Sequence, residues 1–191
     1  EHGWNSEAGI RLKLFRERLA LDASCFHYFL KDGIISQINE TGNTYFVNSG
    51  KIRQWGVENA SSLIVLPYNV NRFFLKRLQW NNSYTWSYFN DDAYITSDED
   101  YSGNRVAGVP RTILINSVHI DLPASLYFFV QHNHTSRIPL NDANTMYADS
   151  YNLLYMKAGY KFMGKRGRTL QVYAAADNLF DEKYSLGNDL N

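Results

Sequence analysis

Residues 77–88 read RLQWNNSYTWSY, a segment in which apolar and polar side chains alternate. Successive side chains of a β-strand point to opposite faces of the sheet, so this alternation predicts a strand with one apolar and one polar face. The apolar face comprises Leu78, Trp80, Tyr84, Trp86 and Tyr88. The polar face comprises Arg77, Gln79, Asn81, Ser83, Thr85 and Ser87. Such a strand is long enough to cross a bilayer, which takes ~9–11 tilted residues.

Comparable alternation recurs along the chain, whereas the periodicity of amphipathic helices is nearly absent. We therefore expect an all-β protein, and no linker or low-complexity segment divides it into separate domains. Several expected strands exceed ten residues and are longer than the usual strand of about 5–6 residues. The eight expected strands cover residues 5–15, 19–32, 48–66, 73–89, 111–122, 125–136, 150–162 and 168–180.

The connections between these strands alternate in length. Short turns rich in Gly, Pro and Asn lie near residues 15–19, 67–72, 122–125 and 163–168. Long polar connections lie near residues 33–47, 90–110 and 137–149. In an antiparallel meander, this alternation places the short turns at one end of the sheet and the long loops at the other. Outer-membrane barrels have this arrangement, with short periplasmic turns and long extracellular loops.

Composition and charge exclude several classes of protein. The 191 residues include 19 Lys+Arg and 19 Asp+Glu, and a net charge of zero argues against a nucleic-acid-binding protein. The single cysteine excludes an intrachain disulfide and a multi-cysteine zinc site. No run approaches the ~18 apolar residues of a membrane-spanning helix, a criterion that does not apply to barrels. Nucleophile-elbow and phosphate-binding glycine-loop motifs are absent, so we do not expect an enzyme.

The residues alone leave the partner of the apolar face open. In a soluble barrel or sandwich this face would pack against a protein core, whereas in a membrane barrel it would contact lipid. Aromatic side chains near the ends of the apolar faces favour the interfacial girdle of a membrane barrel, and they include Trp80, Trp86, Tyr88 and Tyr160. Two alternatives stay open: a complete eight-stranded outer-membrane barrel for adhesion or anchoring, with its first strand paired to its eighth, and a soluble lipocalin-like ligand carrier.

Residues 178–184 read NLFDEKY and resemble the segment that ends the next-to-last barrel strand of TonB-dependent outer-membrane receptors. An alternating strand segment, residues 170–173, precedes it, as expected in that family. Weaker matches follow the order of the family over nearly the whole chain, and they comprise residues 1–4 with Glu7 and Gly9, 48–51, 56–58 and 107–110. The chain is thus similar to the C-terminal part of such a barrel.

This resemblance implies an antiparallel, up-and-down transmembrane β-barrel of about 22 strands around a plug. Residues 1–191 would supply about eight of these strands, without the plug, the TonB box or the final strand. The family implies a receptor in the bacterial outer membrane that takes up a scarce nutrient, most commonly a ferric siderophore. The TonB complex drives uptake through the plug, without a cofactor or a covalent step. Arg77, Gln79 and Glu58 would then face the lumen and contact the plug.

The ligand of such a receptor is expected to contact the outer loops and the upper lumen. Aromatic side chains and arginine suit an anionic ferric chelate with aromatic parts. The expected ligand-binding residues are Tyr94, Tyr101, Arg105, Asn141 and Tyr147. His132 and His134 share one face of an expected strand, but the sequence places no third metal ligand beside them. The acidic loop 91–100 lacks the EF-hand pattern, so no metal site is predicted.

Overall fold

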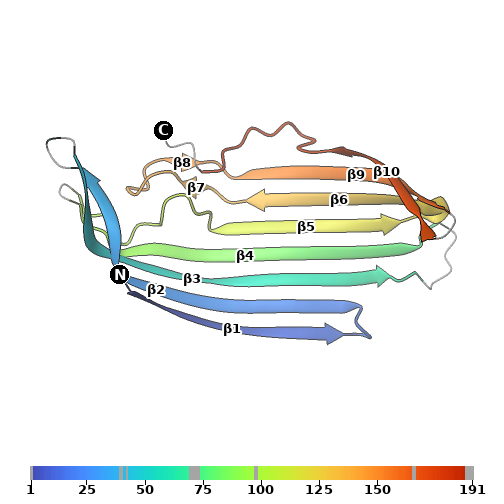
Figure 1. Cartoon of the computed structure of the whole chain (residues 1–191), viewed down its shortest axis with the longest axis horizontal. Coiled ribbons are helices and arrows are strands. Elements are labelled where there is room, and N and C mark those ends of the chain that lie inside the picture. Colours follow the sequence, from blue (N-terminus) through green and yellow to red (C-terminus); the bar gives the residue numbers. More distant parts are fainter. Residues whose placement is uncertain are drawn as a thin grey trace.

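The computed structural model of the chain describes residues 2–38, 41, 43–68, 74–96, 99–164 and 167–187. Eight strands form one antiparallel sheet in the order β1-β2-β3-β4-β5-β6-β9-β10, in which β6 pairs directly with β9 because β7 and β8 lie outside this sheet (Figure 1). The strands of this sheet are β1 (His2–Leu14), β2 (Leu19–Ile38), β3 (Thr44–Leu66), β4 (Arg77–Ala93), β5 (Thr112–Asp121), β6 (Leu126–Thr135), β9 (Tyr151–Met163) and β10 (Thr169–Ala176). A separate pair consists of β7 (Ile138–Pro139) and β8 (Tyr147–Ala148), and η1 (Pro123–Ser125) lies between β5 and β6.

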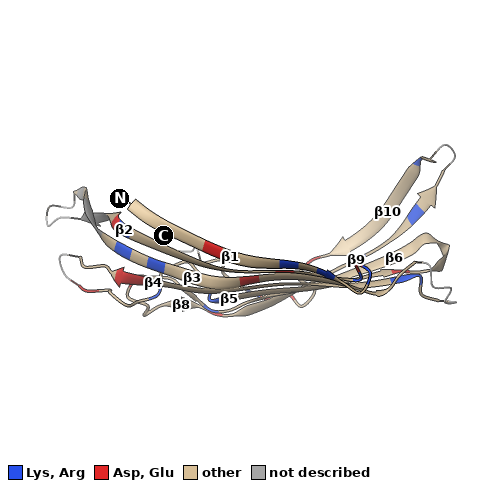
Figure 2. Cartoon of the chain, turned by 90° about the horizontal axis from the view of Figure 1, so that it is seen from below, with Lys and Arg blue, Asp and Glu red and all other residues tan. Residues whose placement is uncertain are grey.

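The sheet is a single curved layer (Figure 2). Among the described residues, β1 pairs only with β2 and β10 only with β9, so the sheet has two free edges. The complete eight-stranded barrel required β1 to pair with β10. The described structure therefore contradicts that alternative and equally disfavours a closed eight-stranded carrier. No membrane-spanning helix is present among the described residues.

The eight predicted strands are confirmed in number and order, but the loop predicted over residues 33–47 is wrong. Here β2 continues to Ile38 and β3 begins at Thr44, so the two strands form a long hairpin (Figure 1). The register between them shifts on either side of Gly33, which faces Gly50. The β-branched and aromatic residues beyond this irregularity favour a strand and include Ile34, Ile35, Tyr45 and Phe46.

The predicted ends of two other strands also need correction. β4 lies about four residues later in the chain than the predicted 73–89, because it begins at Arg77 and continues to Ala93. Residue 73 lies outside the described residues. β10 ends at Ala176 rather than at residue 180, because Asn178 forms a turn with a positive φ of 46°. The Asn178 amide donates to the carbonyl of Glu182 at 2.9 Å and accepts from its backbone N–H at 2.9 Å. Asn tolerates this backbone conformation and closes such turns with its own side chain.

The register confirms that the sheet has one polar and one apolar face. On the polar face, Gln79 donates to Ser62 and Asn81 at 2.8 Å each, joining β3 to β4. On the apolar face, the rings of Trp55 and Trp86 pack with centroids 4.8 Å apart. Large apolar side chains remain uncovered there: Trp4 is 76% exposed and Leu170 is 62% exposed. The apolar face therefore has no covering layer within the described part of the chain.

A chain of amides interrupts the apolar face across β3, β4 and β5. The Asn59 amide donates to Asn82 Oδ1 at 3.2 Å, and the Asn82 amide donates to Asn116 Oδ1 at 3.0 Å. Asn82 lies between Trp80 and Tyr84 on the same face of β4. Each of these amides thus bonds to an amide on a neighbouring strand. An unpaired amide on an apolar surface would cost free energy.

A glycine opposite a tyrosine fixes the contact of β6 with β9 on the polar face. Tyr127 lies opposite Gly159, is 2% exposed and covers the glycine. A methyl group added at Gly159 would lie 2.5 Å from Tyr127 Oη. The tyrosine hydroxyl also accepts a hydrogen bond from Gln171 on β10. The absence of a side chain at Gly159 is therefore what allows the ring to lie flat across β9.

Candidate ligand-recognition site in the long loops

The loop after β4 and the loop after β6 are hydrogen-bonded into one unit. The Asn104 amide donates to the carbonyl of Asp142 at 2.8 Å, and the Gly108 N–H donates to the carbonyl of Pro139 at 2.8 Å. Asn144 accepts from the backbone N–H of Arg105 at 2.8 Å and donates to its carbonyl at 2.9 Å. These two-way contacts fix the loops relative to each other at the end of the sheet where the connections are long (Figure 1).

Acidic and aromatic side chains form one part of this unit. Tyr94 Oη donates to Asp142 Oδ2 at 3.1 Å, and the rings of Tyr94 and Tyr101 pack edge to face with centroids 5.5 Å apart. Burial, followed by the negative charge of Asp142, raises the pKa of Tyr94 to about 12. Asp91 is only 6% exposed and lies beyond the β4–β5 ladder, which ends at Trp86. Burial, together with Asp142, raises the pKa of Asp91 to about 6.

The raised pKa of Asp91 predicts a loop unit that loosens as the pH rises. A folded-state pKa above the ordinary 3.8 means that the folded loops hold the proton more tightly than the open loops. Stability is therefore largest below pH 4 and is lost as the pH rises to about 6. A shift of this size corresponds to at most about 3 kcal/mol, which solvent screening reduces to about 1–2 kcal/mol.

Hydrogen exchange of the folded protein measures this effect. The reporters are the N–H groups of Asp91, which donates to Asn104 at 2.9 Å, and of Gly103, which donates to Asp91 at 2.5 Å. Their protection factors should fall between pH 4 and pH 6.5, and Asp91→Asn should abolish that fall while raising protection at pH 7. The control variant, Asp149→Asn at an exposed carboxylate, should keep the fall. A pH-independent parent would contradict the prediction.

Three arginines form the second part of the unit, which we call the arginine cluster: Arg105, Arg111 and Arg137. Burial lowers the pKa of Arg105, and the positive charges of Arg111 and Arg137 lower it further, whereas Tyr147 acts in the opposite direction. The Arg137 guanidinium lies 4.6 Å from the ring centre of Tyr147. Arg111 Nε is buried without a hydrogen-bond partner. Within the described ranges no carboxylate forms a salt bridge with this cluster, so an incoming anion can supply the missing charge.

The five predicted ligand-binding residues have three different settings. Tyr94 and Tyr101 belong to the acidic and aromatic part, and Arg105 and Tyr147 belong to the arginine cluster. Asn141 instead closes its own turn, because it donates to Thr145 Oγ1 at 2.8 Å and accepts from the Thr145 N–H at 3.0 Å. Ligand contact by all five remains a prediction, and the structure gives Asn141 a supporting role within its loop.

Sequence analysis missed two members of the cluster, Arg111 and Arg137. Arg111 stands at the start of an expected strand and Arg137 at the start of an expected loop, so neither position marks a site. Their charges act on Arg105 because the two loops lie side by side. The available signal was an arginine at the outer end of each of two strands that are neighbours in a meander.

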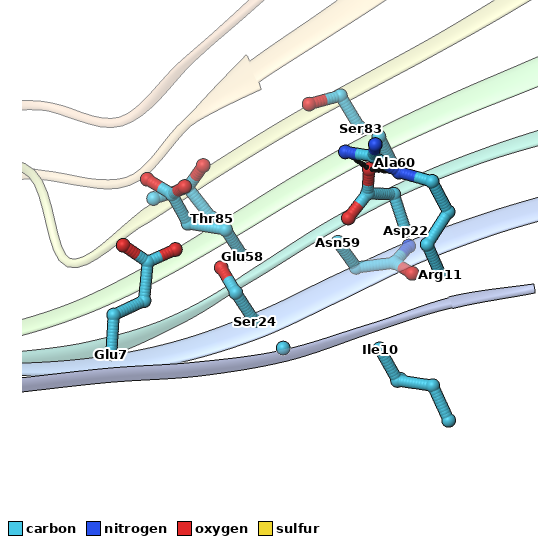
Figure 3. Close-up of a pocket in the computed structure, with 11 residues that line it drawn as sticks. Glu7, Ile10, Arg11, Asp22, Ser24, Glu58, Asn59, Ala60, Ser83 and Thr85 are labelled. Atoms are coloured by element: carbon cyan, nitrogen blue, oxygen red, sulfur yellow. Dashed lines mark hydrogen bonds and ion pairs between the residues drawn. The ribbon is translucent and has the colours of Figure 1, made fainter.

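A separate depression lies on the polar face between β1 and β4, with a volume of about 700 Å³ (Figure 3). Arg11 and Asp22 form a salt bridge there, with Arg11 Nη2 2.5 Å from Asp22 Oδ2. Glu7 and Arg11 point to the same side of the sheet, whereas Ile10 points to the other. Neither Glu7 nor Glu58 forms a salt bridge with another described residue. The depression therefore presents two uncompensated carboxylates to the polar side of the sheet.

Comparison with solved structures places the fold among siderophore receptors. The ferric yersiniabactin uptake receptor FyuA from Yersinia pestis matches with a TM-score of 0.70 and 23% identity, over 99% of this chain and 26% of that receptor. BauA, the ferric preacinetobactin receptor from Acinetobacter baumannii, matches with a TM-score of 0.73 and 16% identity, over 95% and 26%. The siderophore receptor PiuA from Acinetobacter baumannii matches with a TM-score of 0.74 and 17% identity, over 96% and 25%.

These likenesses establish the fold, and the chain spans about a quarter of the length of each receptor. The family and the matched proteins are transport receptors rather than enzymes. The family model described as "TonB dependent receptor-like, beta-barrel" matches residues 1–179. The resemblance at residues 178–184 thus pointed to the right family. The chain belongs to the TonB-dependent receptor-like β-barrel family.

Proposed function

We propose that residues 1–191 form the C-terminal part of the barrel of an outer-membrane receptor that takes up a ferric siderophore by TonB-dependent transport. The observation that carries this proposal is the arginine cluster at the long loops, for which no salt bridge with a carboxylate is found within the described residues. Many ferric siderophores are anionic and carry aromatic groups. Charge-assisted hydrogen bonds from guanidinium groups suit such a ligand, and Tyr147 adds an aromatic surface beside them.

The two faces of the sheet have separate roles in this proposal. The uncovered apolar face contacts lipid, and the aromatic rings at its two ends lie at the interfaces. The polar face lines the lumen, where the carboxylates of Glu7 and Glu58 accept cationic side chains of the plug. Arg77 and Gln79 also lie on this face, and we propose that they contact the plug. No covalent step is involved, and TonB supplies the force through the plug.

Iron uptake by the full-length receptor tests the ligand. A siderophore-deficient strain carrying the receptor is given radioactive iron as a catecholate, a hydroxamate and a citrate complex. We expect uptake of at least one complex, and uptake should stop when TonB is deleted. Uptake of none of them, or uptake that persists without TonB, would overturn the proposal.

The double variant Arg105→Gln/Arg137→Gln tests the arginine cluster. Loss of charged hydrogen bonds should weaken binding of the transported complex by about tenfold to a hundredfold, equivalent to about 1.5–3 kcal/mol. Quenching of tryptophan fluorescence in detergent measures the affinity. Arg168→Gln, an exposed arginine beside the short β9–β10 turn, is the control and should bind like the parent. Equal affinity of all three proteins would exclude the arginine cluster as the anion site.

A further inference from the structure

His132 and His134 of β6 converge with Asn152 of β9 at a single point. His132 Nε2 lies 3.1 Å from Asn152 Oδ1, and His134 Nδ1 lies 3.0 Å from the same oxygen. Alternate residues of a strand project from one face, so the two imidazoles lie side by side on β6. Asn152 is placed across from them because it pairs with His134 in the β6–β9 ladder. The register thus brings a third oxygen or nitrogen group, the Asn152 amide of β9, beside the two histidines.

The chemistry of these three groups suits a late divalent transition metal. Neutral imidazole nitrogens bind Zn²⁺, Cu²⁺ and Ni²⁺. Each of these two nitrogens donates its N–H to Asn152 Oδ1 in the absence of metal, and the other tautomer of the ring presents a lone pair there. The register positions beside the pair are also free of cationic residues: His132 faces Asn116 and Leu154, and His134 faces Leu114. No like charge at these positions opposes a cation. Both imidazoles are only half-buried, and His134 lies one residue from the loop end of β6, so an ion can reach them from that end of the sheet.

We propose that His132, His134 and Asn152 form a binding site for a divalent transition-metal ion, with two imidazole nitrogens and one amide oxygen as ligands and water in the remaining positions. The site lies on the apolar face of the sheet, at the end next to the long loops. It is separate from the arginine cluster and does not depend on the proposed function. Bound metal joins β6 to β9 at this end and stabilises the folded receptor by mass action.

Copper binding by the purified full-length receptor tests the site. The receptor is stripped with EDTA, exchanged into a non-chelating buffer and titrated with CuCl₂ alone. We expect one saturable Cu²⁺ per receptor above the background, with an electron paramagnetic resonance spectrum that shows two coordinated nitrogens. Affinity should fall from Cu²⁺ to Ni²⁺ and Zn²⁺. A spectrum without coordinated nitrogen would overturn the proposal, whatever the receptor transports.

Variants distinguish a metal site from a hydrogen-bonded cluster. His134→Gln should lower the Cu²⁺ affinity at least about tenfold, whereas Asn152→Asp, which replaces the amide by a charged ligand of equal size, should raise it about tenfold. His27→Gln changes a histidine on the same face of β2, four strands from β6, and should bind Cu²⁺ like the parent. Heat-modifiable mobility on gels confirms that each variant is folded. Equal affinity of the parent, His134→Gln and Asn152→Asp would refute the site, because two of its three ligands would then be irrelevant.

Discussion

Valine in place of Gly159 is expected to destabilise the folded receptor by about 3 kcal/mol or more, at the upper end of the range for overpacked sites. The new side chain would overlap the ring of Tyr127, whose Cζ lies 2.6 Å from the position of the added Cβ. The ring has little room to move, because it is buried, stacks on His119 at a centroid distance of 6.1 Å and accepts a hydrogen bond from Gln171. Relief therefore requires β9 to separate from β6.

Urea titration of the full-length receptor in detergent micelles, monitored by tryptophan fluorescence, measures this loss. Ala158→Val is the matched control, because it adds the same branched side chain one residue earlier, on the exposed apolar face. We expect the control to remain within about 0.5 kcal/mol of the parent. The second change Tyr127→Ala should recover part of the stability of Gly159→Val. Equal midpoints for Gly159→Val and Ala158→Val would show that the ring does not restrict this position.

Removal of the Asp121 carboxylate is expected to cost about 2–3 kcal/mol, because it removes the buried, charged acceptor that two hydrogen bonds share. Asp121 is 6% exposed and accepts hydrogen bonds from Tyr68 and from His119, the latter at 3.2 Å. Lys161 Nζ on β9 lies 3.9 Å away. One carboxylate thus joins the turn after β3 to β5 and β9, at the end of the sheet with the short turns.

The same urea titration of Asp121→Ala measures this contribution. Asp121→Asn keeps the shape and some of the hydrogen bonds, so it should lose about half as much stability. Asp149→Ala removes an exposed carboxylate and should change stability by less than about 0.5 kcal/mol. If Asp121→Ala were as stable as Asp149→Ala, the contacts of Asp121 would contribute nothing to the fold.

The strands were predictable because their information is local. Alternation over residues 77–88 is enough to assign a strand and its two faces. The outer part of the β2–β3 hairpin was missed, because Gly33 and the polar stretch 39–43 suggest a loop when the pairing partner is unknown. The end of β10 depends on a side chain, since Asn178 closes the turn with Glu182.

The sites were less predictable because their members come from separate parts of the chain. The charges of Arg105 and Arg137 influence each other only because the two loops are joined by Asn144. Asn152 reaches His132 and His134 because β9 pairs directly with β6, although β7 and β8 lie between these two strands in the sequence. Residue type identifies candidate ligand-binding residues, but the pairing of strands and loops decides which of these residues lie next to each other.

The amides of Asn59, Asn82 and Asn116 help to set the register in which β3, β4 and β5 pair. A strand that slips by two residues keeps its apolar and polar faces, because side chains repeat with a period of two. The apolar pattern alone cannot reject that mistake. After such a slip Asn82 would face Leu114 or Val118 instead of Asn116, and its amide would meet hydrocarbon without a partner. The three amides thus disfavour a slipped register, because only the correct register pairs them with one another on the apolar face.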